Sequence, residues 1–317
     1  MAAGTLSIGE GGSSTEVTVS GAVPFSLPTE GAGVAGDLVF IPADEEITAA
    51  NSAGKIVVRD NPPCSIPYSV FEMIGHYLTE DLPTDGEYDR PYLRAPDQVL
   101  IDAGIAGAAG VIVVWDVPTD QFTGYWDPHS GTRFRVPAVY VGNDARQELV
   151  DAARAGTTAK LQVLDEWSTV ATRNLFATLP AQTRERIVVT TNTDSVTWVQ
   201  ENGTVTSIAL ARYFGSLPKK CRTRDIQFAL TTNHLGFNND GAVRYGDQLD
   251  EDYDKGTVAF VMSPEHLGTK EILPTGENRR LEYSGDAELF AWSAPPESPV
   301  LVEASVDAVK RRNLQRV

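Results

Sequence analysis

Short apolar runs alternate with helical segments and polar loops along this chain, and the alternation restricts its fold. In the second half, strand-like runs at 174–180, 186–191, 225–231 and 256–261 accompany a helical segment at 203–214. Strands that alternate with helices are joined by right-handed crossovers and form a largely parallel sheet with helices on both faces. The sequence therefore predicts an α/β unit over residues 169–317.

The first half, residues 1–168, has a more β-rich pattern. The run Gly110–Trp115 is entirely apolar, which is typical of a buried strand. Asp97 is expected to cap one helix, and Asp144 with Gln147 forms the pattern of a capping box at the start of another. The proline-rich stretch 61–96 is expected to be an excursion outside the core. The elements expected are strands at 37–41, 55–60, 110–115, 136–141 and 160–164, and helices at 97–108 and 144–155.

Charge excludes two classes of partner. The formal net charge is -17, which repels nucleic-acid phosphates and anionic lipid, so we expect neither a nucleic-acid nor a membrane-surface role. No run of about 18 apolar residues predicts a transmembrane helix, and the first residues do not resemble a signal peptide. Cys64 and Cys221 carry no metal-binding spacing, and the sequence does not decide between free thiols and one disulfide.

Polar residues that can bind metals follow three of the predicted strands. Because the carboxyl ends of parallel strands share one edge of a sheet, these segments are expected to lie close together. Imidazole and carboxylate groups suit zinc, and zinc-bound water is a nucleophile near neutral pH. Asn, Asp and Thr are also ordinary turn residues, and a histidine here can be structural. The segments are Asn192–Thr193–Asp194, Thr232–Asn233–His234 and Pro264–Glu265–His266, with Glu201 just before the helix at 203–214.

Residues 20–165 resemble a protease-associated (PA) domain. The motifs that carry the resemblance are Gly54–Val58, the alanine-rich helix that leads into Ala108–Val114, and Val136–Val141. PA domains are β-rich, non-catalytic domains found in or beside peptidases. The resemblance implies that the loop with Tyr125, Trp126 and His129 faces a catalytic cleft; otherwise it is an ordinary exposed aromatic loop.

Residues 172–268 resemble the catalytic unit of zinc aminopeptidases of the leucine-aminopeptidase and glutamate-carboxypeptidase type. The resemblance rests on an Asn-rich opening strand at 174–180, Asn192–Ser195 where the family has His-x-Asp-Ser, and Glu201–Asn202–Gly203 before a helix that contains Ala209–Arg212. Asn192 stands where the family has a zinc-binding histidine, and Asn233–His234 stands where it has paired glutamates. A standard two-zinc site is therefore not expected. Family elements at both ends are missing from this chain, which predicts a truncated unit.

Two functions remain open. The first is a divergent metal-dependent hydrolase of peptide or small amide substrates that binds one zinc ion through Glu201, His234, Glu265 and His266. In it His234 and Glu201 take part in catalysis, and Asp194 and Asn192 orient the ligands. The second is a non-catalytic, peptidase-like binding module that has lost its zinc ligands. A homodimer is compatible with either. Relatives of this kind are commonly exported, so the sequence leaves the localisation undecided.

Overall fold

The computed structural model divides the chain into two compact units. Unit 1 comprises residues 1–76, 81–168 and 272–285, and unit 2 comprises residues 77–80, 169–271 and 286–317. The structure describes residues 3–62, 65–74, 77–79, 81–89, 96–124, 132–166, 168–193, 202–233, 240–265, 267, 270–289, 292, 294–295 and 297–316.

Unit 1 is built on an eight-stranded sheet with the order β2-β1-β10-β4-β5-β8-β9-β3. β4, β5, β8 and β9 run parallel to one another, whereas β10, β1, β2 and β3 pair antiparallel to their neighbours. The apolar run at 110–115 is β8 and is buried on both faces, as its composition predicts. The strands are β1 (Ala3–Ile8), β2 (Thr15–Val17), β3 (Gly21–Ala22), β4 (Val34–Phe40), β5 (Ile56–Asn61), β8 (Gly110–Trp115), β9 (Ala138–Gly142) and β10 (Thr158–Leu164).

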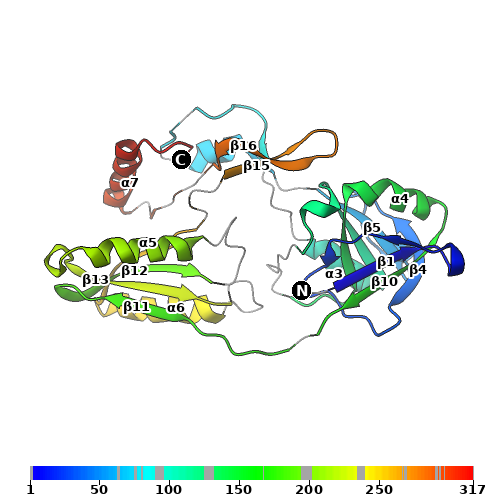
Figure 1. The fold of residues 1–317 in the computed structure, drawn as a ribbon, viewed down its shortest axis with the longest axis horizontal. Helices are drawn as coiled ribbons and strands as arrows, with labels where there is room; N and C mark the ends of the chain where they lie inside the picture. The colour runs from blue at the N-terminus through cyan, green and yellow to red at the C-terminus, as the bar shows by residue number, and fades with distance from the viewer. Residues whose placement is uncertain are drawn as a thin grey trace. The chain divides into compact units, whose positions relative to one another are not determined.

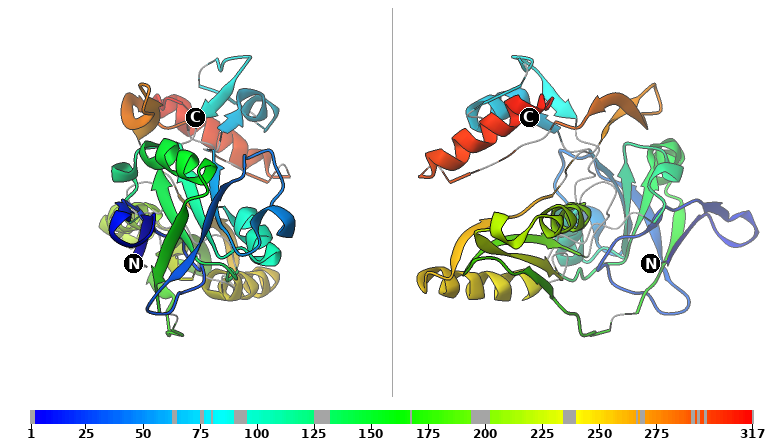
Figure 2. Two further views of the ribbon diagram at one scale, coloured as in Figure 1. Left: turned by 90° about the vertical axis from the view of Figure 1, so that its right-hand side faces the viewer. Right: turned by 60° about the vertical axis from the view of Figure 1, so that its left-hand side comes forward.

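Two helices cover opposite faces of this sheet (Figure 2). α4 (Asn143–Arg154) buries Leu149 in a cluster with Ile112 and Val139. α3 (Asp97–Ala106) buries Leu100 in a second cluster that contains Trp115. Alternate residues of β8 and β9 therefore serve two separate cores, one under each helix. Shorter helical segments are α1 (Ala49–Ser52), η1 (Gly11–Ser13) and η2 (Thr119–Gln121).

The expected helix caps are wrong in detail. α3 is preceded by Pro96 at the N-cap position, so Asp97 is already the first helical residue. α4 begins after Gly142, and the Asp144 carboxylate accepts hydrogen bonds from the backbone N and the Oγ1 of Thr119. Thr119, 25 residues away in the sequence, thus uses the carboxylate that the capping box would need, because the fold brings its N–H and hydroxyl groups to Asp144.

The stretch 61–96 contains short secondary-structure elements of its own. Its described residues form β6 (Ser65–Pro67), α2 (Tyr68–Ile74) and β7 (Glu87–Asp89), with β6 antiparallel to β7. Tyr88 is buried, and its ring lies 6.2 Å from that of Tyr68 and 6.1 Å from that of Phe71. Aromatic packing orders part of this excursion, but none of its described residues belongs to the core clusters of the sheet, as expected from the sequence.

Unit 2 has a four-stranded sheet with the order β11-β13-β12-β14. β14 (Val258–Met262), β12 (Thr183–Asn192) and β13 (Arg224–Thr231) are parallel, and β11 (Leu175–Leu179) is an antiparallel edge strand. α5 (Gly203–Ser216) and α6 (Asp240–Asp254) lie on opposite faces of this sheet (Figure 1). The prediction of a mostly parallel α/β sheet with helices on both faces is confirmed.

Alternation along β12 explains how one strand serves both helices. Val188 packs with Tyr245 and Leu249 of α6, whereas the next residue, Val189, faces Leu210 and other residues of α5. The acidic run at 250–252 lies on α6, where Asp252 forms an ion pair with Arg186. η3 (Lys219–Cys221) and α7 (Pro299–Arg312) complete the unit, and the basic residues of 310–312 form the last turn of α7.

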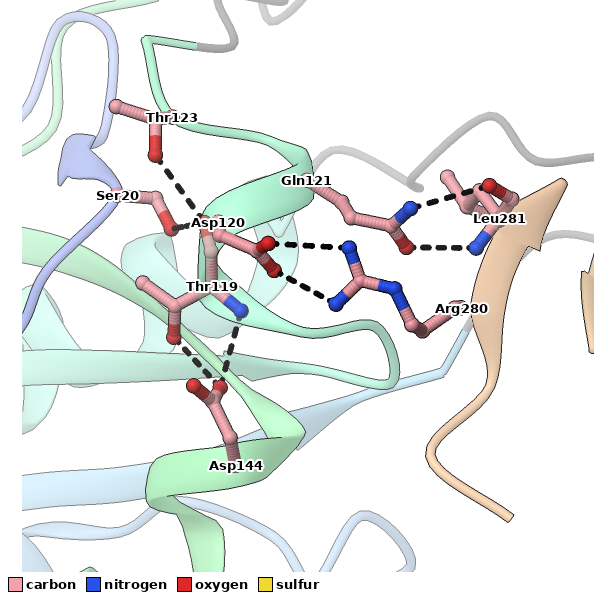
Figure 3. Close-up of polar contacts among 8 residues, drawn as sticks. All are labelled: Ser20, Thr119, Asp120, Gln121, Thr123, Asp144, Arg280 and Leu281. Atoms are coloured by element: carbon pink, nitrogen blue, oxygen red, sulfur yellow. Dashed lines mark hydrogen bonds and ion pairs between the residues drawn. The ribbon is translucent and has the colours of Figure 1, made fainter. Parts of the chain in front are cut away.

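One segment that follows the unit 2 sheet belongs to unit 1. β15 (Lys270–Thr275) and β16 (Arg280–Ala287) form a hairpin, of which residues 272–285 pack with unit 1. Arg280 makes a bidentate ion pair with Asp120 at 3.0 and 3.2 Å, and the Gln121 amide exchanges two hydrogen bonds with the backbone of Leu281 (Figure 3). The hairpin tip is therefore held by paired polar contacts.

Candidate functional site

The candidate site lies at the edge of the unit 2 sheet where the three parallel strands end. β12 ends at Asn192, β13 at Thr231 and β14 at Met262. Asn192 stands opposite Thr231 in the register of β12 and β13. The segments that leave these strands start from one edge, which is where open α/β sheets bind ligands.

Asn192 links the ends of these strands through both groups of its side-chain amide. Its Nδ2 donates a hydrogen bond of 2.7 Å to Oε1 of Glu265, and its Oδ1 accepts one of 3.0 Å from Oγ1 of Thr231. Asn192 is only 9% exposed and Thr231 only 2%, so these bonds lie where an unpaired polar group would be costly. The amide therefore fixes the Glu265 carboxylate at the edge of the sheet.

The segment with Glu265 is held on both sides. Oγ1 of Thr191 donates to the carbonyl of Pro264 at 3.1 Å. The amide of Asn202 donates to the carbonyl of Leu267 at 2.5 Å and accepts from the N–H of Leu267 at 2.9 Å. Asn202 occupies the N-cap position of α5, but its side chain makes no capping bond because the amide is used by Leu267.

The segment after β13 is held in the same manner. The Asn174 amide accepts a hydrogen bond of 3.0 Å from the N–H of Thr232 and donates one of 2.8 Å to the carbonyl of Gly241. Asn233 has a left-handed backbone with φ of 64°, which asparagine tolerates better than most residues. This conformation agrees with the interpretation of Asn233 as a turn residue.

Solved structures of aminopeptidases share this arrangement of elements. The zinc aminopeptidase from Bacillus subtilis matches 99% of this chain with a TM-score of 0.58 and 19% identity. The peptidase M28 precursor from Shewanella amazonensis and the aminopeptidase from Aneurinibacillus sp. strain AM-1 each match 86% of it, with TM-scores of 0.56 and 0.51 and identities of 17% and 18%. The chain has an aminopeptidase-like fold.

At these identities the similarity concerns the fold alone. The chain spans 65%, 61% and 60% of the three aminopeptidase structures, in the order given above. No protein-family model matches the sequence, and no curated protein matches it.

Of the site residues predicted from sequence, the structure brings Asn192 and Glu265 together. The Asn192 amide at the end of β12 donates a hydrogen bond to the Glu265 carboxylate, which follows β14. The remaining predicted residues lie outside the described residues: Asp194, Glu201, His234 and His266 in the second half of the chain, and Tyr125, Trp126 and His129 in the first half.

The described part of this edge has donor types that suit zinc, but too few of them. Glu265 offers a carboxylate, whereas Asn192 and Asn202 offer amides, which are poor zinc ligands. Among the described residues no group of three His, Cys, Asp or Glu side chains is arranged to hold a metal ion. A zinc site here would thus need Glu201, His234 and His266 in addition to Glu265.

Sequence reasoning missed the contributions of Asn174 and Thr191. Both have side chains that bond to the backbone of segments more than 50 residues away. The only local signal was an asparagine or threonine at the end of a strand, and such residues are common there for other reasons.

Unit 1 has a cavity at the carboxyl ends of its own parallel strands. Its volume is about 240 Å³, and the Asp60–Arg146 ion pair lies in its wall, with two hydrogen bonds of 2.8 and 2.6 Å. This hydrogen bonding raises the pKa of Arg146, which stays charged. The cavity is lined by Ala43, Asp60, Asn61, Pro62, Val114, Trp115, Asp116, Asn143 and Arg146.

Two remaining expectations concern cysteine and the membrane. Cys221 is an exposed free thiol, whereas Cys64 lies outside the described residues. In the part of the chain that the structure describes, no helix combines the length and the apolar character needed to cross a bilayer.

Proposed function

We propose that unit 2 carries the active site of a metal-dependent hydrolase of peptide or small amide bonds. The observation that supports this proposal is the hydrogen bond between Asn192 and Glu265, which fixes a carboxylate at the ligand-binding edge of an aminopeptidase-like sheet. The two residues are 73 positions apart, so the fold itself brings them together. Carboxylates that bind metals are generally held by such hydrogen bonds.

The proposed site would bind one zinc ion through Glu201 and His234, with Glu265 or His266 as the third ligand, which leaves one position for water. Zinc bound at such a site supplies a water molecule of lowered pKa as the nucleophile. Oε1 of Glu265 is engaged by the Asn192 amide, so Oε2 is the oxygen proposed as the ligand. Glu201 and His234 are proposed to take part in catalysis as ligands of the zinc that activates the water, and the loop with Tyr125, Trp126 and His129 is proposed to contact the substrate.

The same hydrogen bond also favours a second candidate function. The neutral amide of Asn192 gives Oε1 of Glu265 and Oγ1 of Thr231 hydrogen-bond partners without a cation. A non-catalytic module that binds peptides on a peptidase-like scaffold would need nothing more.

Metal content separates the two candidates. Wild type and two variants are purified, supplied with zinc, dialysed and analysed for metal. The variants are His234→Ala, which removes a proposed ligand, and His76→Ala, the control, which removes a histidine that is not a proposed ligand. The hydrolase proposal expects about one zinc ion per chain in wild type and His76→Ala, and loss of zinc in His234→Ala. Wild type that holds no zinc under these conditions refutes the hydrolase proposal and leaves the binding module.

A further inference from the structure

Two segments leave the carboxyl edge of the unit 2 sheet, and each carries residues proposed as zinc ligands. The first, 264–267, contains Glu265 and position 266. The second runs from Thr232 to Gly241 and contains position 234. In each case an asparagine from elsewhere in the sequence bonds to the backbone at the flanks of the segment.

Each of the two asparagines uses both the oxygen and the nitrogen of its side-chain amide. Asn202 accepts from the N–H of Leu267 and donates to the carbonyl of the same residue. Asn174 accepts from the N–H of Thr232 and donates to the carbonyl of Gly241, so that it closes the two ends of its segment. A side-chain amide has one donor side and one acceptor side, as a peptide group has, and can therefore replace a missing partner strand for both backbone groups.

A glycine completes each arrangement at the start of a helix. A Cβ on Gly203, the first residue of α5, would overlap the carbonyl oxygen of Pro264 and Oγ1 of Thr191. A Cβ on Gly241, in the first turn of α6, would overlap the carbonyl oxygen of Thr232 and lie 2.8 Å from Oδ1 of Asn174. Both segments thus pass so close to a helix that only glycine fits there.

We infer that Asn174 and Asn202 are positioning residues, which hold the backbone of Thr232, Gly241 and Leu267, next to the proposed zinc ligands, independently of any metal ion. The inference rests on the proposed function for the purpose of the positioning, but the hydrogen bonds themselves do not depend on it. The described residues that flank the proposed ligands are fixed by groups of the sheet and helices. A site whose ligands are set beforehand in this way loses less conformational entropy when it binds.

We call the bonds of Asn174 to Thr232 and Gly241, and those of Asn202 to Leu267, the two clamps. Hydrogen exchange at single backbone amides tests both clamps without a metal ion. Asn202→Ala is expected to accelerate exchange of the Leu267 amide about tenfold, and Asn174→Ala that of the Thr232 amide about tenfold, because each loses its acceptor. Each variant serves as the control for the other segment. Gln182→Ala, which removes an amide that bonds to the carbonyl of Lys220 away from this edge, is the matched control for both.

An aspartate variant separates positioning from a general loss of structure. Asn202→Asp keeps an oxygen that can accept from Leu267 but removes the Nδ2 donor, so slow exchange at Leu267 should be largely retained while the Ala variant loses it. Unchanged exchange at Leu267 in Asn202→Ala and at Thr232 in Asn174→Ala overturns the clamps.

Zinc affinity, measured by competition with a chromophoric chelator, tests whether the clamps position the proposed zinc ligands. Asn174→Ala and Asn202→Ala should bind zinc about ten- to a hundredfold more weakly than wild type, with Gln182→Ala unchanged. Faster exchange with unaltered affinity overturns the positioning role. Wild type without zinc overturns the proposed function instead, and the exchange rates still decide whether the clamps exist.

Discussion

Replacing Gly203 by alanine should destabilise unit 2, although alanine is the better helix former. In an ordinary helix position the change from glycine to alanine stabilises by about 0.5–1 kcal/mol. At Gly203 the new Cβ would overlap the Pro264 carbonyl and Oγ1 of Thr191. Overpacking of this kind costs about 1–3 kcal/mol, and loss of the bond between Thr191 and Pro264 adds about 1 kcal/mol. We expect a net destabilisation of about 1–3 kcal/mol.

Gly246 provides the matched control. It lies within α6 of the same unit, and a Cβ built there meets no atom within 4 Å. Gly246→Ala should therefore stabilise unit 2 by about 0.5–1 kcal/mol. The same chemical change in two helices that flank one sheet is thus expected to act with opposite signs.

Native-state hydrogen exchange of the β12 amides of Val188 and Val189 measures the opening of unit 2 separately from unit 1. Both residues are almost fully buried, so their slowest exchange reports the global opening of that sheet. The two variants should differ by about 2–4 kcal/mol in this opening free energy. Equal stabilisation by both variants would show that the segment 264–267 does not pack against the start of α5 as described.

Three further predictions concern charged and titrating groups. The hydrogen bonds from Arg280 lower the pKa of Asp120. In Arg280→Ala this pKa should rise toward its ordinary value, as measured by carboxyl carbon NMR. The pair contributes to stability above the ordinary pKa of the carboxyl group, and this contribution is lost as the pH falls through the lowered pKa. Burial raises the pKa of Tyr245 to about 12, so stability relative to Tyr245→Phe should be lost as pH rises from about 10 through about 12, measured by urea unfolding; an equal pH dependence of the two proteins contradicts this. Arg59 is buried and donates hydrogen bonds to the carbonyls of residues 41, 42, 43 and 45. Arg59→Met should therefore lower the free energy of unfolding of unit 1 by about 3 kcal/mol. Hydrogen exchange of the β5 amides at increasing urea concentration measures this loss.

Local pattern was sufficient for most helices and strands. The apolar run at 110–115 is β8, and the helical segment predicted at 203–214 is α5, which extends to Ser216. These elements depend on side chains a few residues apart, whose periodicity can be read along the chain. The predicted mostly parallel sheet follows from the order of the elements alone.

Details that depend on a distant partner were not readable in this way. The capping box at Asp144 is wrong because Thr119 takes its carboxylate, and the segment 272–285 packs with unit 1 although its neighbours in sequence belong to unit 2. Asn202 was correctly placed before α5, but its amide serves Leu267, 65 residues further along.

The sequence by itself determined the elements, the class of the sheet and the edge at which polar residues gather, because hydrophobic periodicity and turn residues act over a few positions. Only the tertiary structure decided which of those polar residues meet. Asn192 and Glu265 are 73 residues apart, and many other asparagines and carboxylates satisfy the same local patterns. The register of β12, β13 and β14 and the close approach of Pro264 to Gly203 of α5 bring this pair together, since hydrogen bonds require atoms within about 3 Å of each other.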